Sequence, residues 1–165
     1  MRSYYLVNDE IKTFDEPIGE EWTAEKSATE TVLSDIHVLV VDDSAINLMV
    51  ADKTLQKFGA TTTKAYSGKE ALKIFEAQKF DLILMDLHMP GLDGFETSDL
   101  LQATESFKQH PAPIMAYTTY AYSEVTEKII SHKMNGYIGK PFTQAQVINS
   151  IFAVLRISQD NKQTH

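Results

Sequence analysis

From Ile36 onward, short apolar runs alternate with longer amphipathic segments, and this alternation constrains the fold more than any other feature of the chain. The apolar runs cover residues 36–41, 61–65, 80–85, 113–117 and 136–138. Runs of this length are typical of strands, and the first, third and fourth are apolar enough to be covered on both faces. Strands covered on both faces belong to parallel sheets that lie between two layers of helices.

The segments between the runs have the pattern of helices and cover residues 44–58, 67–78, 95–107, 123–132 and 143–157. Ser67 and Glu70 have the spacing of a capping box at the start of the second segment. Gly59 follows the first segment, and Thr143 can cap the last. Five strand–helix units within about 120 residues predict a parallel α/β sheet with helices on both faces, because crossover connections are right-handed.

Polar residues follow four of the five predicted strands, and they are Asp42, Asp43, Ser44, Asp86, Thr118 and Lys140. In a parallel sheet the carboxyl ends of the strands share one edge, and ligands bind there. Taken alone, each residue also fits a helix cap, a turn, a strand or an exposed charge. Their common position at the strand ends predicts that they form one functional site.

The chemistry of this predicted site is specific. Clustered carboxylates repel one another, which raises their pKa values unless a cation lies between them. Oxygen donors without histidine or cysteine side chains favour Mg²⁺, and the chain contains no cysteine. A carboxylate beside Mg²⁺ can attack a phosphoryl group, while a lysine and a hydroxyl neutralise the phosphoryl oxygens. The residues therefore predict a site that accepts a phosphoryl group on an aspartate.

The segments VLVVDDS, LILMDLHMPGLDG, PIMAYTT and GYIGKPF, in this order and spacing, resemble the motifs of the receiver domains of two-component response regulators. The resemblance covers residues 36–157, which we expect to form the receiver domain. It implies a flavodoxin-like, doubly wound (βα)5 fold with five parallel strands in the order 2-1-3-4-5 and helices on both faces.

The resemblance implies a role for each acidic residue of the site. Asp86 is the expected phosphoacceptor, and Asp43 is an expected direct ligand of Mg²⁺. Asp42 is expected to contribute to the Mg²⁺ site largely through water. The backbone carbonyl of His88 would complete the protein's share of the coordination.

The resemblance also implies a conformational switch. Thr118 and Lys140 would each bind an oxygen of the phosphoryl group on Asp86. Tyr137 matches the aromatic residue that rotates inward when the threonine moves. The peptide bond between Lys140 and Pro141 is expected to be cis.

Two features depart from the family pattern. Lys133 stands where many relatives have a glycine, and because a left-handed lysine is strained we expect this corner to be built differently. His88 and Tyr120 lie two residues beyond Asp86 and Thr118, in positions that flank the path of the hydrolytic water. We hypothesise that their bulk slows self-dephosphorylation; the alternative for His88 is an exposed side chain that contributes only its carbonyl.

A partner surface is predicted on the first helix. At 100° per residue, Met49 lies opposite the predicted core stripe, and Ile46 and Val50 flank that stripe on one side. An apolar patch beside the phosphoacceptor suits the docking of a histidine-bearing helix from a phosphotransfer domain or a kinase. Exposed apolar residues are also common without a partner.

The ends of the chain have a different composition. Residues 1–35 carry nine acidic and three basic side chains, a net charge of −6, and they lack sustained periodicity. We expect a flexible acidic tail or linker there. Its apolar residues, Tyr4, Tyr5, Leu6, Val7 and Trp22, leave open that part of it docks on the domain. Residues 158–165 are expected to be a C-terminal tail.

The chain is expected to act as a phosphoacceptor with slow self-dephosphorylation, and not as an enzyme. The first helix and MDLHMPGLDGFET resemble receivers of hybrid sensor histidine kinases, so the chain is interpreted as the receiver piece of such a kinase, and the alternative is a stand-alone response regulator. The expected partners are a sensor histidine kinase or a histidine phosphotransfer domain, and a phosphorylation-dependent homodimer is left open.

Two other classes fit less well. A phosphatase of the haloacid dehalogenase type remains a remote alternative, because such enzymes need an Asp-x-Asp motif after the first strand and this chain has Asp42-Asp43-Ser44 there. A receiver fold used only for binding is disfavoured by the complete set of site residues.

The net charge of −8 excludes a general nucleic-acid binder. The chain lacks a long apolar run and a leader pattern, so we expect a cytoplasmic protein with no direct membrane contact.

Overall fold

Five parallel strands form the centre of the protein. The computed structural model describes residues 3–7, 10–14 and 32–163. The parallel strands are β3 (His37–Val41), β4 (Thr61–Ala65), β5 (Leu82–Met85), β6 (Ile114–Thr118) and β7 (Gly136–Gly139). Their order across the sheet is β4-β3-β5-β6-β7. This is the predicted order 2-1-3-4-5, so the doubly wound fold is confirmed.

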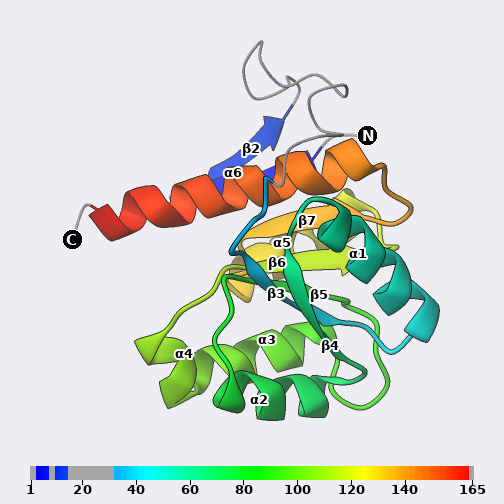
Figure 1. Ribbon diagram of the computed structural model, residues 1–165, viewed down its shortest axis with the longest axis vertical. Helices are drawn as coiled ribbons and strands as arrows, with labels where there is room; N and C mark the ends of the chain where they lie inside the picture. The colour runs from blue at the N-terminus through cyan, green and yellow to red at the C-terminus, as the bar shows by residue number, and fades with distance from the viewer. Residues whose placement is uncertain (1–2, 8–9, 15–31, 164–165) are drawn as a thin grey trace.

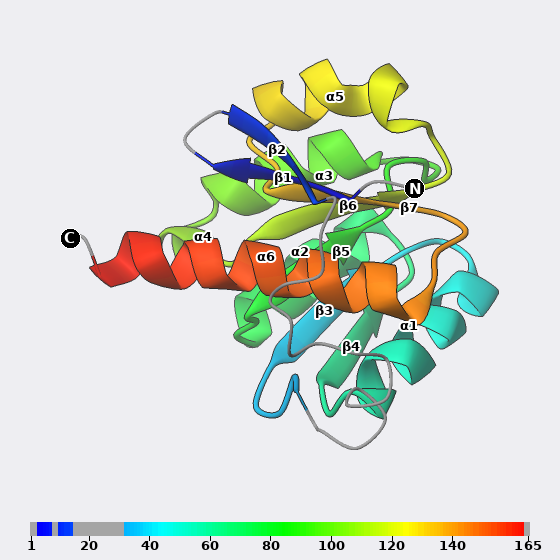
Figure 2. The same cartoon turned by 90° about the horizontal axis from the view of Figure 1, so that it is seen from above.

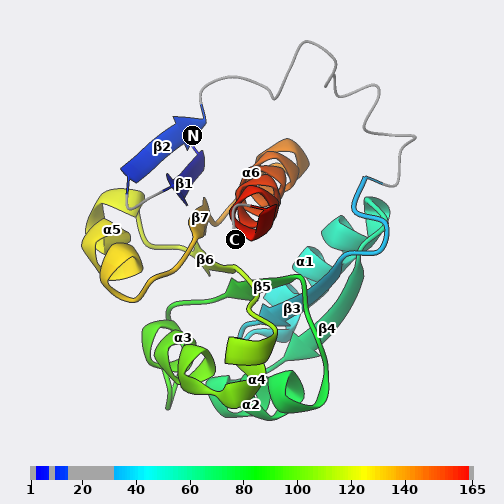
Figure 3. The same cartoon turned by 90° about the vertical axis from the view of Figure 1, so that its left-hand side faces the viewer.

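Helices cover both faces of the sheet. They are α1 (Ala45–Lys57), α2 (Gly68–Ala77), α3 (Gly94–Ala103), α4 (Glu105–Gln109), α5 (Tyr122–Ser131) and α6 (Gln144–Gln163). α1 and α6 lie on one face, and the other helices lie on the opposite face (Figures 1 and 3). None of the helices among the described residues is long and apolar enough to cross a membrane.

The strands alternate their side chains between two hydrophobic cores. In β3, Val38 and Val40 point to the core beneath α1 and α6, whereas Leu39 and Val41 point to the core on the other face. All four side chains are fully buried. Such burial on both faces requires a continuous apolar run and explains why this strand was recognisable from its sequence.

The helix ends follow their predicted caps. The Ser67 hydroxyl accepts a hydrogen bond from the Glu70 amide at the start of α2. Thr143 and Gln146 cap each other's amides before α6. Gly59 follows α1 in a left-handed conformation, with φ of +93°. These local hydrogen bonds satisfy backbone groups that the helices themselves leave unpaired.

Two predicted helix boundaries are wrong. The segment expected as one helix from residue 95 to 107 is broken at Thr104, whose extended backbone ends α3 and caps α4. The Thr104 hydroxyl accepts a hydrogen bond from the Phe107 amide, a local bond that competes with helix continuation. α6 continues to Gln163, so residues 158–163 extend the helix and are not a tail.

The corner after α5 also differs from its prediction. Lys133 adopts the left-handed conformation, with φ of +54°, so the chain keeps the left-handed cap and is not built differently there. The amides of Lys133 and Met134 donate to the carbonyls of Ile130 and Ile129. These bonds close the end of the helix and offset the steric cost of a left-handed lysine, which is about 1 kcal/mol.

Two strands precede the predicted domain. β1 (Ser3–Val7) and β2 (Glu10–Phe14) pair antiparallel, and β1 also pairs antiparallel with β7. The expectation of a flexible tail is therefore wrong for these residues, whereas residues 15–31, which include Trp22, lie outside the described residues. The complete sheet has seven strands in the order β2-β1-β7-β6-β5-β3-β4. Within residues 1–14 two acidic and two basic side chains balance, so the acidic character of the first 35 residues comes from residues 15–35.

Candidate functional site

The predicted polar residues meet at one edge of the sheet. Asp42 and Asp43 follow β3, Asp86 follows β5, Thr118 ends β6 and Lys140 follows β7. One carboxylate oxygen from each of the three aspartates lies within 4.8 Å of the others. The parallel strand order brings together residues that are separated by up to 98 positions in the chain.

The three aspartates differ in their exposure. Asp42 is fully buried and Asp86 is 6% exposed, whereas Asp43 is exposed. A buried carboxylate requires hydrogen bonds or a cation, because an unpaired charge is costly away from water. The exposed Asp43 leaves one side of the cluster accessible to solvent and to an incoming ion.

The first turn of α1 holds Asp42 in place. Its Oδ1 accepts hydrogen bonds from the Ser44 amide at 2.8 Å and from the Asn47 side-chain amide at 3.2 Å. Ser44 is also the N-cap of α1, so the helix and the carboxylate are positioned by the same turn. The site predicted from the sequence did not include Asn47. Its position five residues after a strand-end aspartate, within the first helical turns, was the available signal.

Lys140 is the cation of the site. Its ammonium forms an ion pair with Oδ2 of Asp42 and lies 3.5 Å from Oδ1 of Asp86. It also lies over the ring of Tyr117, 4.2 Å from the ring centroid. The peptide bond to Pro141 is cis, as predicted. One ammonium group is thus placed between two buried carboxylates.

Tyr117 is a further residue that sequence reasoning did not identify. It is buried at the end of β6, and its ring supports the lysine by a cation–π contact. Burial raises the pKa of Tyr117, and the negative charges of Asp42 and Asp86 raise it further. The phenol therefore stays protonated throughout the physiological range, and its ring remains neutral beneath the ammonium.

The environment of Asp86 disfavours its charged form. Burial raises the pKa of this carboxyl, the charge of Lys140 opposes the rise, and the charge of Asp42 adds to it. The His88 amide donates to Oδ1 of Asp86 at 3.5 Å, which also opposes the rise. The net shift is upward, so one ammonium does not fully compensate the clustered negative charge and a further cation would be favoured.

This shift predicts that Asp86→Asn stabilises the metal-free protein at neutral pH. A carboxyl whose pKa is raised on folding destabilises the folded state at every pH above the raised value. The effect fades as the pH falls towards the ordinary value of 3.8. We expect an increase of about 1 kcal/mol, or ~2–4 °C in Tm for a domain of this size.

Thermal unfolding at pH 7 and at decreasing pH tests this expectation, and the difference between the two proteins should narrow as the pH is lowered. Adding Mg²⁺ should raise the Tm of the wild type more than that of the variant. A variant that melts below the wild type at pH 7 would mean that the pairing of Asp86 with Lys140 outweighs its burial and repulsion.

Thr118 connects the site to Tyr137. The Tyr120 amide donates to the Thr118 hydroxyl at 3.2 Å, and the Tyr137 hydroxyl donates to the Tyr120 carbonyl at 2.6 Å. Both Thr118 and Tyr137 are buried, and the ring of Tyr137 also lies edge-on against Tyr122. Two hydrogen bonds through the loop after β6 thus join the residues that were predicted to form the switch.

His88 and Tyr120 contact each other beside the site. The Tyr120 hydroxyl and Nδ1 of His88 are 3.1 Å apart, and the two rings are nearly perpendicular. Both side chains are exposed, with Tyr120 at 39%. The side chain of His88 therefore has a partner, in addition to the role that was predicted for its backbone carbonyl.

Gly94 allows α3 to begin directly against the acceptor segment. A Cβ atom at this position would lie 2.1 Å from the carbonyl oxygen of Asp86 and 2.8 Å from the Cα of Leu87. The Gly94 amide donates to the Leu87 carbonyl at 3.2 Å. The absence of a side chain at Gly94 is therefore part of what places Asp86.

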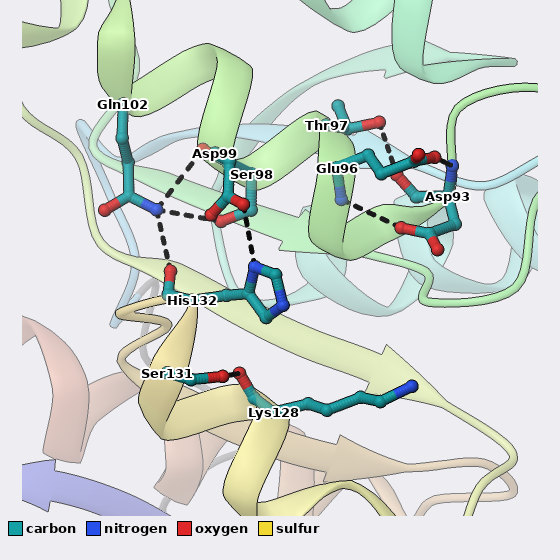
Figure 4. Close-up of polar contacts among 9 residues, drawn as sticks. All are labelled: Asp93, Glu96, Thr97, Ser98, Asp99, Gln102, Lys128, Ser131 and His132. Carbon is teal, nitrogen blue, oxygen red and sulfur yellow. Dashed lines mark hydrogen bonds and ion pairs between the residues drawn. The ribbon is translucent and has the colours of Figure 1, made fainter.

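α3 is fixed at both ends (Figure 4). At its start, Asp93 and Glu96 form a reciprocal capping box. Nearer its end, the Asp99 carboxylate lies 2.8 Å from Nδ1 of His132, and the Gln102 side chain donates to the His132 carbonyl at 2.9 Å. These contacts join α3, which follows the acceptor segment, to the end of α5.

The predicted docking residues are exposed. Ile46 is 69% exposed, Met49 46% and Val50 43%, and all three lie on α1 within eight residues of Asp42. The exposure agrees with the predicted geometry of the helix, and a docking role stays a prediction. We refer to Ile46, Met49 and Val50 as the α1 patch.

The donor set fits a hard divalent cation. The three carboxylates supply oxygen atoms only, one of them is exposed, and the net charge of the cluster exceeds what Lys140 neutralises. Mg²⁺ prefers such oxygen ligands and keeps several of its own waters. Together with a lysine and a hydroxyl at the same edge, the arrangement can stabilise a phosphoryl group on a carboxylate oxygen.

Comparisons with known proteins agree with this chemistry. A family model described as "Response regulator receiver domain" matches residues 38–152. A protein described as probable histidine kinase 4 of Oryza sativa subsp. japonica is 35% identical over 134 residues. The match covers 70% of this chain and 13% of the rice protein, so the similarity concerns one part of a much longer relative.

Solved receiver domains have the same fold. The receiver domain of the sensor histidine kinase PA1611 from Pseudomonas aeruginosa PAO1, with a magnesium ion coordinated in its active site cleft, is 30% identical, with a TM-score of 0.66. The match covers 73% of this chain and 97% of that one. The receiver domain of the histidine kinase CKI1 from Arabidopsis thaliana, complexed with Mg²⁺ and BeF3⁻, is 30% identical with a TM-score of 0.63, over 77% of this chain and 92% of that one.

Proposed function

The chain belongs to the receiver domain family of response regulators, in which the acidic pocket accepts a phosphoryl group, and from that premise we propose that it receives this group from a phosphohistidine onto Asp86. The observation that carries the proposal is the position of Lys140 between the carboxylates of Asp42 and Asp86. An ammonium held there counters charge on the acceptor and on the arriving phosphoryl group.

The transfer requires one bond to break and one to form. A carboxylate oxygen of Asp86 attacks phosphorus, the phosphorus–nitrogen bond of the donor breaks, and the electron pair of that bond returns to the donor imidazole. Lys140 pairs with one phosphoryl oxygen, and the Thr118 hydroxyl donates to another. Because Thr118 is fully buried beside the pocket, its hydroxyl needs only a local movement to reach a group on Asp86.

The residues proposed to hold Mg²⁺ are Asp42, Asp43, Asp86 and the backbone carbonyl of His88. Their support in this chain is the set of three carboxylate oxygens that lie within 4.8 Å of one another. Bound there, the ion neutralises phosphoryl charge that Lys140 does not reach. Magnesium in the receiver domain of PA1611, which is 30% identical to this chain, is consistent with this assignment.

Phosphorylation would be read out through Thr118 and Tyr137. When the Thr118 hydroxyl turns towards the phosphoryl group, it leaves its hydrogen bond with the Tyr120 amide. Tyr137 is already buried and held by the Tyr120 carbonyl, the inward position that was expected only after this movement, so phosphorylation would stabilise a position that the tyrosine already occupies. The chain would act as a phosphorylated switch, with slow self-dephosphorylation, and not as an enzyme that turns over a substrate. Its context would be a hybrid sensor histidine kinase, and a stand-alone response regulator is the alternative.

Incubation with acetyl phosphate tests the proposal. Intact mass should show one added phosphoryl group that requires both Mg²⁺ and Asp86, with Asp86→Asn as the matched control. Rapid hydrolysis can hide the adduct, so beryllofluoride binding is measured in parallel by the shift of signals from Thr118 and Tyr137. A protein that gives neither the adduct nor the shifts would be a receiver fold used only for binding.

We predict that the contact between His88 and Tyr120 prolongs the phosphorylated state. In the receiver family these two positions flank the path of the hydrolytic water, so replacing them by His88→Asn with Tyr120→Glu should open that path. We expect the phosphoryl lifetime to fall about tenfold, which corresponds to ~1.4 kcal/mol of barrier. Loss of the adduct with time, followed by intact mass, measures it. The control is His110→Asn, because His110 is also an exposed histidine but lies outside the site. An unchanged phosphoryl lifetime in the double variant would show that the contact between His88 and Tyr120 does not shield the site.

The α1 patch is proposed to dock the histidine-bearing partner. Met49→Asp should weaken phosphoryl transfer from the cognate histidine protein about tenfold, the effect of losing ~1.4 kcal/mol of contact, and should leave acetyl phosphate labelling unchanged. Leu100→Asp on α3 is a matched control, because Leu100 is 45% exposed and Met49 is 46% exposed. Equal loss of both activities in Met49→Asp would count against docking.

A further inference from the structure

Tyr117 and Lys140 come from neighbouring strands and lie on the same face of the sheet. Tyr117 is opposite Ile138 across the ladder between β6 and β7. Side chains two positions apart in a strand share a face, so Lys140, just past the end of β7, is a diagonal neighbour of Tyr117. The Lys140 amide donates to the Thr118 carbonyl at 2.7 Å. The backbone of β6 thus fixes the point from which the lysine side chain extends.

The ammonium of Lys140 contacts two kinds of group. It forms an ion pair with Oδ2 of Asp42 and lies 3.5 Å from Oδ1 of Asp86. It also lies 4.2 Å from the centroid of the Tyr117 ring. The side chain of Lys140 is only 10% exposed, and a cation–π contact is stronger where water is excluded. The ring therefore contributes to the position of the ammonium together with the two carboxylates.

The contact with the ring is the one that the proposed reaction leaves unchanged. Asp42 and Asp86 are proposed Mg²⁺ ligands and Asp86 is the proposed phosphoacceptor, so both ion pairs of Lys140 change as the reaction proceeds. Tyr117 has neither role, and its ring stays neutral because burial and the nearby carboxylates raise the pKa of its hydroxyl. A ring face attracts a cation without fixing the direction of its N–H bonds. The ammonium can therefore turn from a carboxylate oxygen to a phosphoryl oxygen while it stays over the ring.

The Tyr117 ring is itself held firmly. It is 2% exposed and belongs to the hydrophobic core beneath α1 and α6. The connection from β7 to α6 turns at the edge of the sheet where α1 begins (Figure 2). Phe142 lies in this connection, and its ring centroid is 5.5 Å from that of Tyr117. Because a close-packed core restricts the ring, the surface that Tyr117 offers to the ammonium has a fixed position.

We propose that Tyr117 is a positioning residue for phosphoryl transfer: its ring holds the Lys140 ammonium beside Asp86 while the ion pairs of that ammonium change. The inference rests on the proposed function, in which Lys140 pairs with a phosphoryl oxygen. Tyr117 acts through the lysine and does not touch the phosphoryl group. Its contribution therefore depends on the electron density of the ring face, and it disappears when the lysine is absent.

Fluorination of the ring tests the proposal at nearly constant side-chain size. Phenylalanine, difluorophenylalanine and trifluorophenylalanine are introduced at position 117 of the full chain, because each fluorine weakens the attraction of a ring face for a cation. Tyr117→Phe keeps this face and should be labelled by acetyl phosphate within about twofold of the wild-type rate. The trifluoro protein should be labelled about tenfold more slowly, with the difluoro protein between the two. Equal rates across the series would overturn the proposal.

The same series in Lys140→Ala separates positioning from a structural role. If the ring acts through the ammonium, fluorination should have no further effect on the labelling rate once the lysine is removed. A ring that only supports the core would lower the rate by the same factor with and without Lys140, and that outcome would also overturn the proposal.

Tyr117→Leu removes the ring altogether, and Phe58→Leu is its matched control. Phe58 is also 2% exposed and belongs to the same hydrophobic core, but it lies at the C-terminal end of α1. Thermal unfolding should show a loss of stability in both variants. At a temperature where both are folded, only Tyr117→Leu should be labelled more slowly, by about tenfold. The same labelling rate in both variants would contradict the role of the ring.

The wild type distinguishes failure of this inference from failure of the proposed function. An adduct that requires Asp86 and Mg²⁺, together with equal rates in the fluorinated series, overturns only the role of Tyr117. A wild type that forms no adduct and binds no beryllofluoride overturns the phosphoacceptor chemistry, and with it the role of Tyr117.

Discussion

Lys140→Ala should reduce the rate of phosphorylation by acetyl phosphate about 100- to 1000-fold, the effect of removing one preorganised group that stabilises transition-state charge. The ammonium contacts both buried carboxylates, so its loss leaves the arriving phosphoryl group without a fixed partner on that side. Affinity for Mg²⁺ should rise in the same variant, because a competing cation is removed from the acidic cluster. The opposite signs of the two effects separate loss of catalysis from loss of folding.

Stopped-flow or mass-based labelling rates and a Mg²⁺ titration measure these two quantities. Lys108→Ala is a suitable control. Lys108 forms an exposed ion pair with Glu105 on α4, and α4 precedes β6, whereas the site lies at the carboxyl ends of the strands. A variant that loses Mg²⁺ binding and phosphorylation together would show that Lys140 supports the structure of the pocket and does not act on the phosphoryl group.

Gly94→Ala should damage both stability and function. The new methyl group would overlap the Asp86 carbonyl oxygen, which belongs to the backbone and cannot move aside as a flexible side chain does. We expect a loss of about 3 kcal/mol in the free energy of unfolding, which is typical of a severe overpacking substitution. Displacement of the Asp86 backbone should also lower the affinity for Mg²⁺ and the yield of the phosphoryl adduct.

Gly91→Ala provides the comparison within the same segment. A Cβ atom at Gly91 has nothing within 4 Å, but the residue has φ of +82°, so alanine there is strained without a clash. The expected cost is about 1 kcal/mol, with Mg²⁺ binding retained. Denaturant unfolding of the two variants distinguishes these effects, and equal losses would mean that backbone conformation, rather than the contact with Asp86, sets the cost.

Lys140 and Gly94 contribute to the same site in complementary ways. Lys140 supplies charge from the end of β7, and Gly94 allows the acceptor backbone to lie close to the start of α3. A displaced acceptor would not meet the ammonium, and a well-placed acceptor without the ammonium would keep its repulsion from Asp42. Function therefore depends on the position of the backbone as much as on the charged groups.

The sequence alone predicted the fold and the chemical groups of the site. Continuous apolar runs such as residues 36–41 indicate strands buried on both faces, and caps such as Ser67 mark helix starts, because these signals are local and repeat with the geometry of the chain. The strand-end positions of Asp86 and Lys140 followed from the same pattern. Local signals also have limits: Thr104 interrupts a helical pattern through one hydroxyl contact, and Lys133 tolerates a left-handed conformation that its residue type disfavours.

The N-terminal strands show a second limit. The segments SYYLV and EIKTF, separated by Asn8 and Asp9, have the composition and spacing of a β-hairpin. Because many acidic residues follow these two segments, the whole of residues 1–35 was expected to be a tail or linker. An added strand also needs an edge to pair with, and that edge at β7 exists only after the five-stranded sheet has formed.

Only the tertiary structure decided how the groups of the site act on one another. The sequence determined which carboxylates, hydroxyl and ammonium reach the strand ends, because strand periodicity is local. The cation–π support from Tyr117, the hold of Asn47 on Asp42 and the close approach at Gly94 depend on distances between separate elements. Those distances arise when helices and strands pack into two close-packed cores, a process that involves residues far apart in the chain and leaves no periodic trace in the sequence.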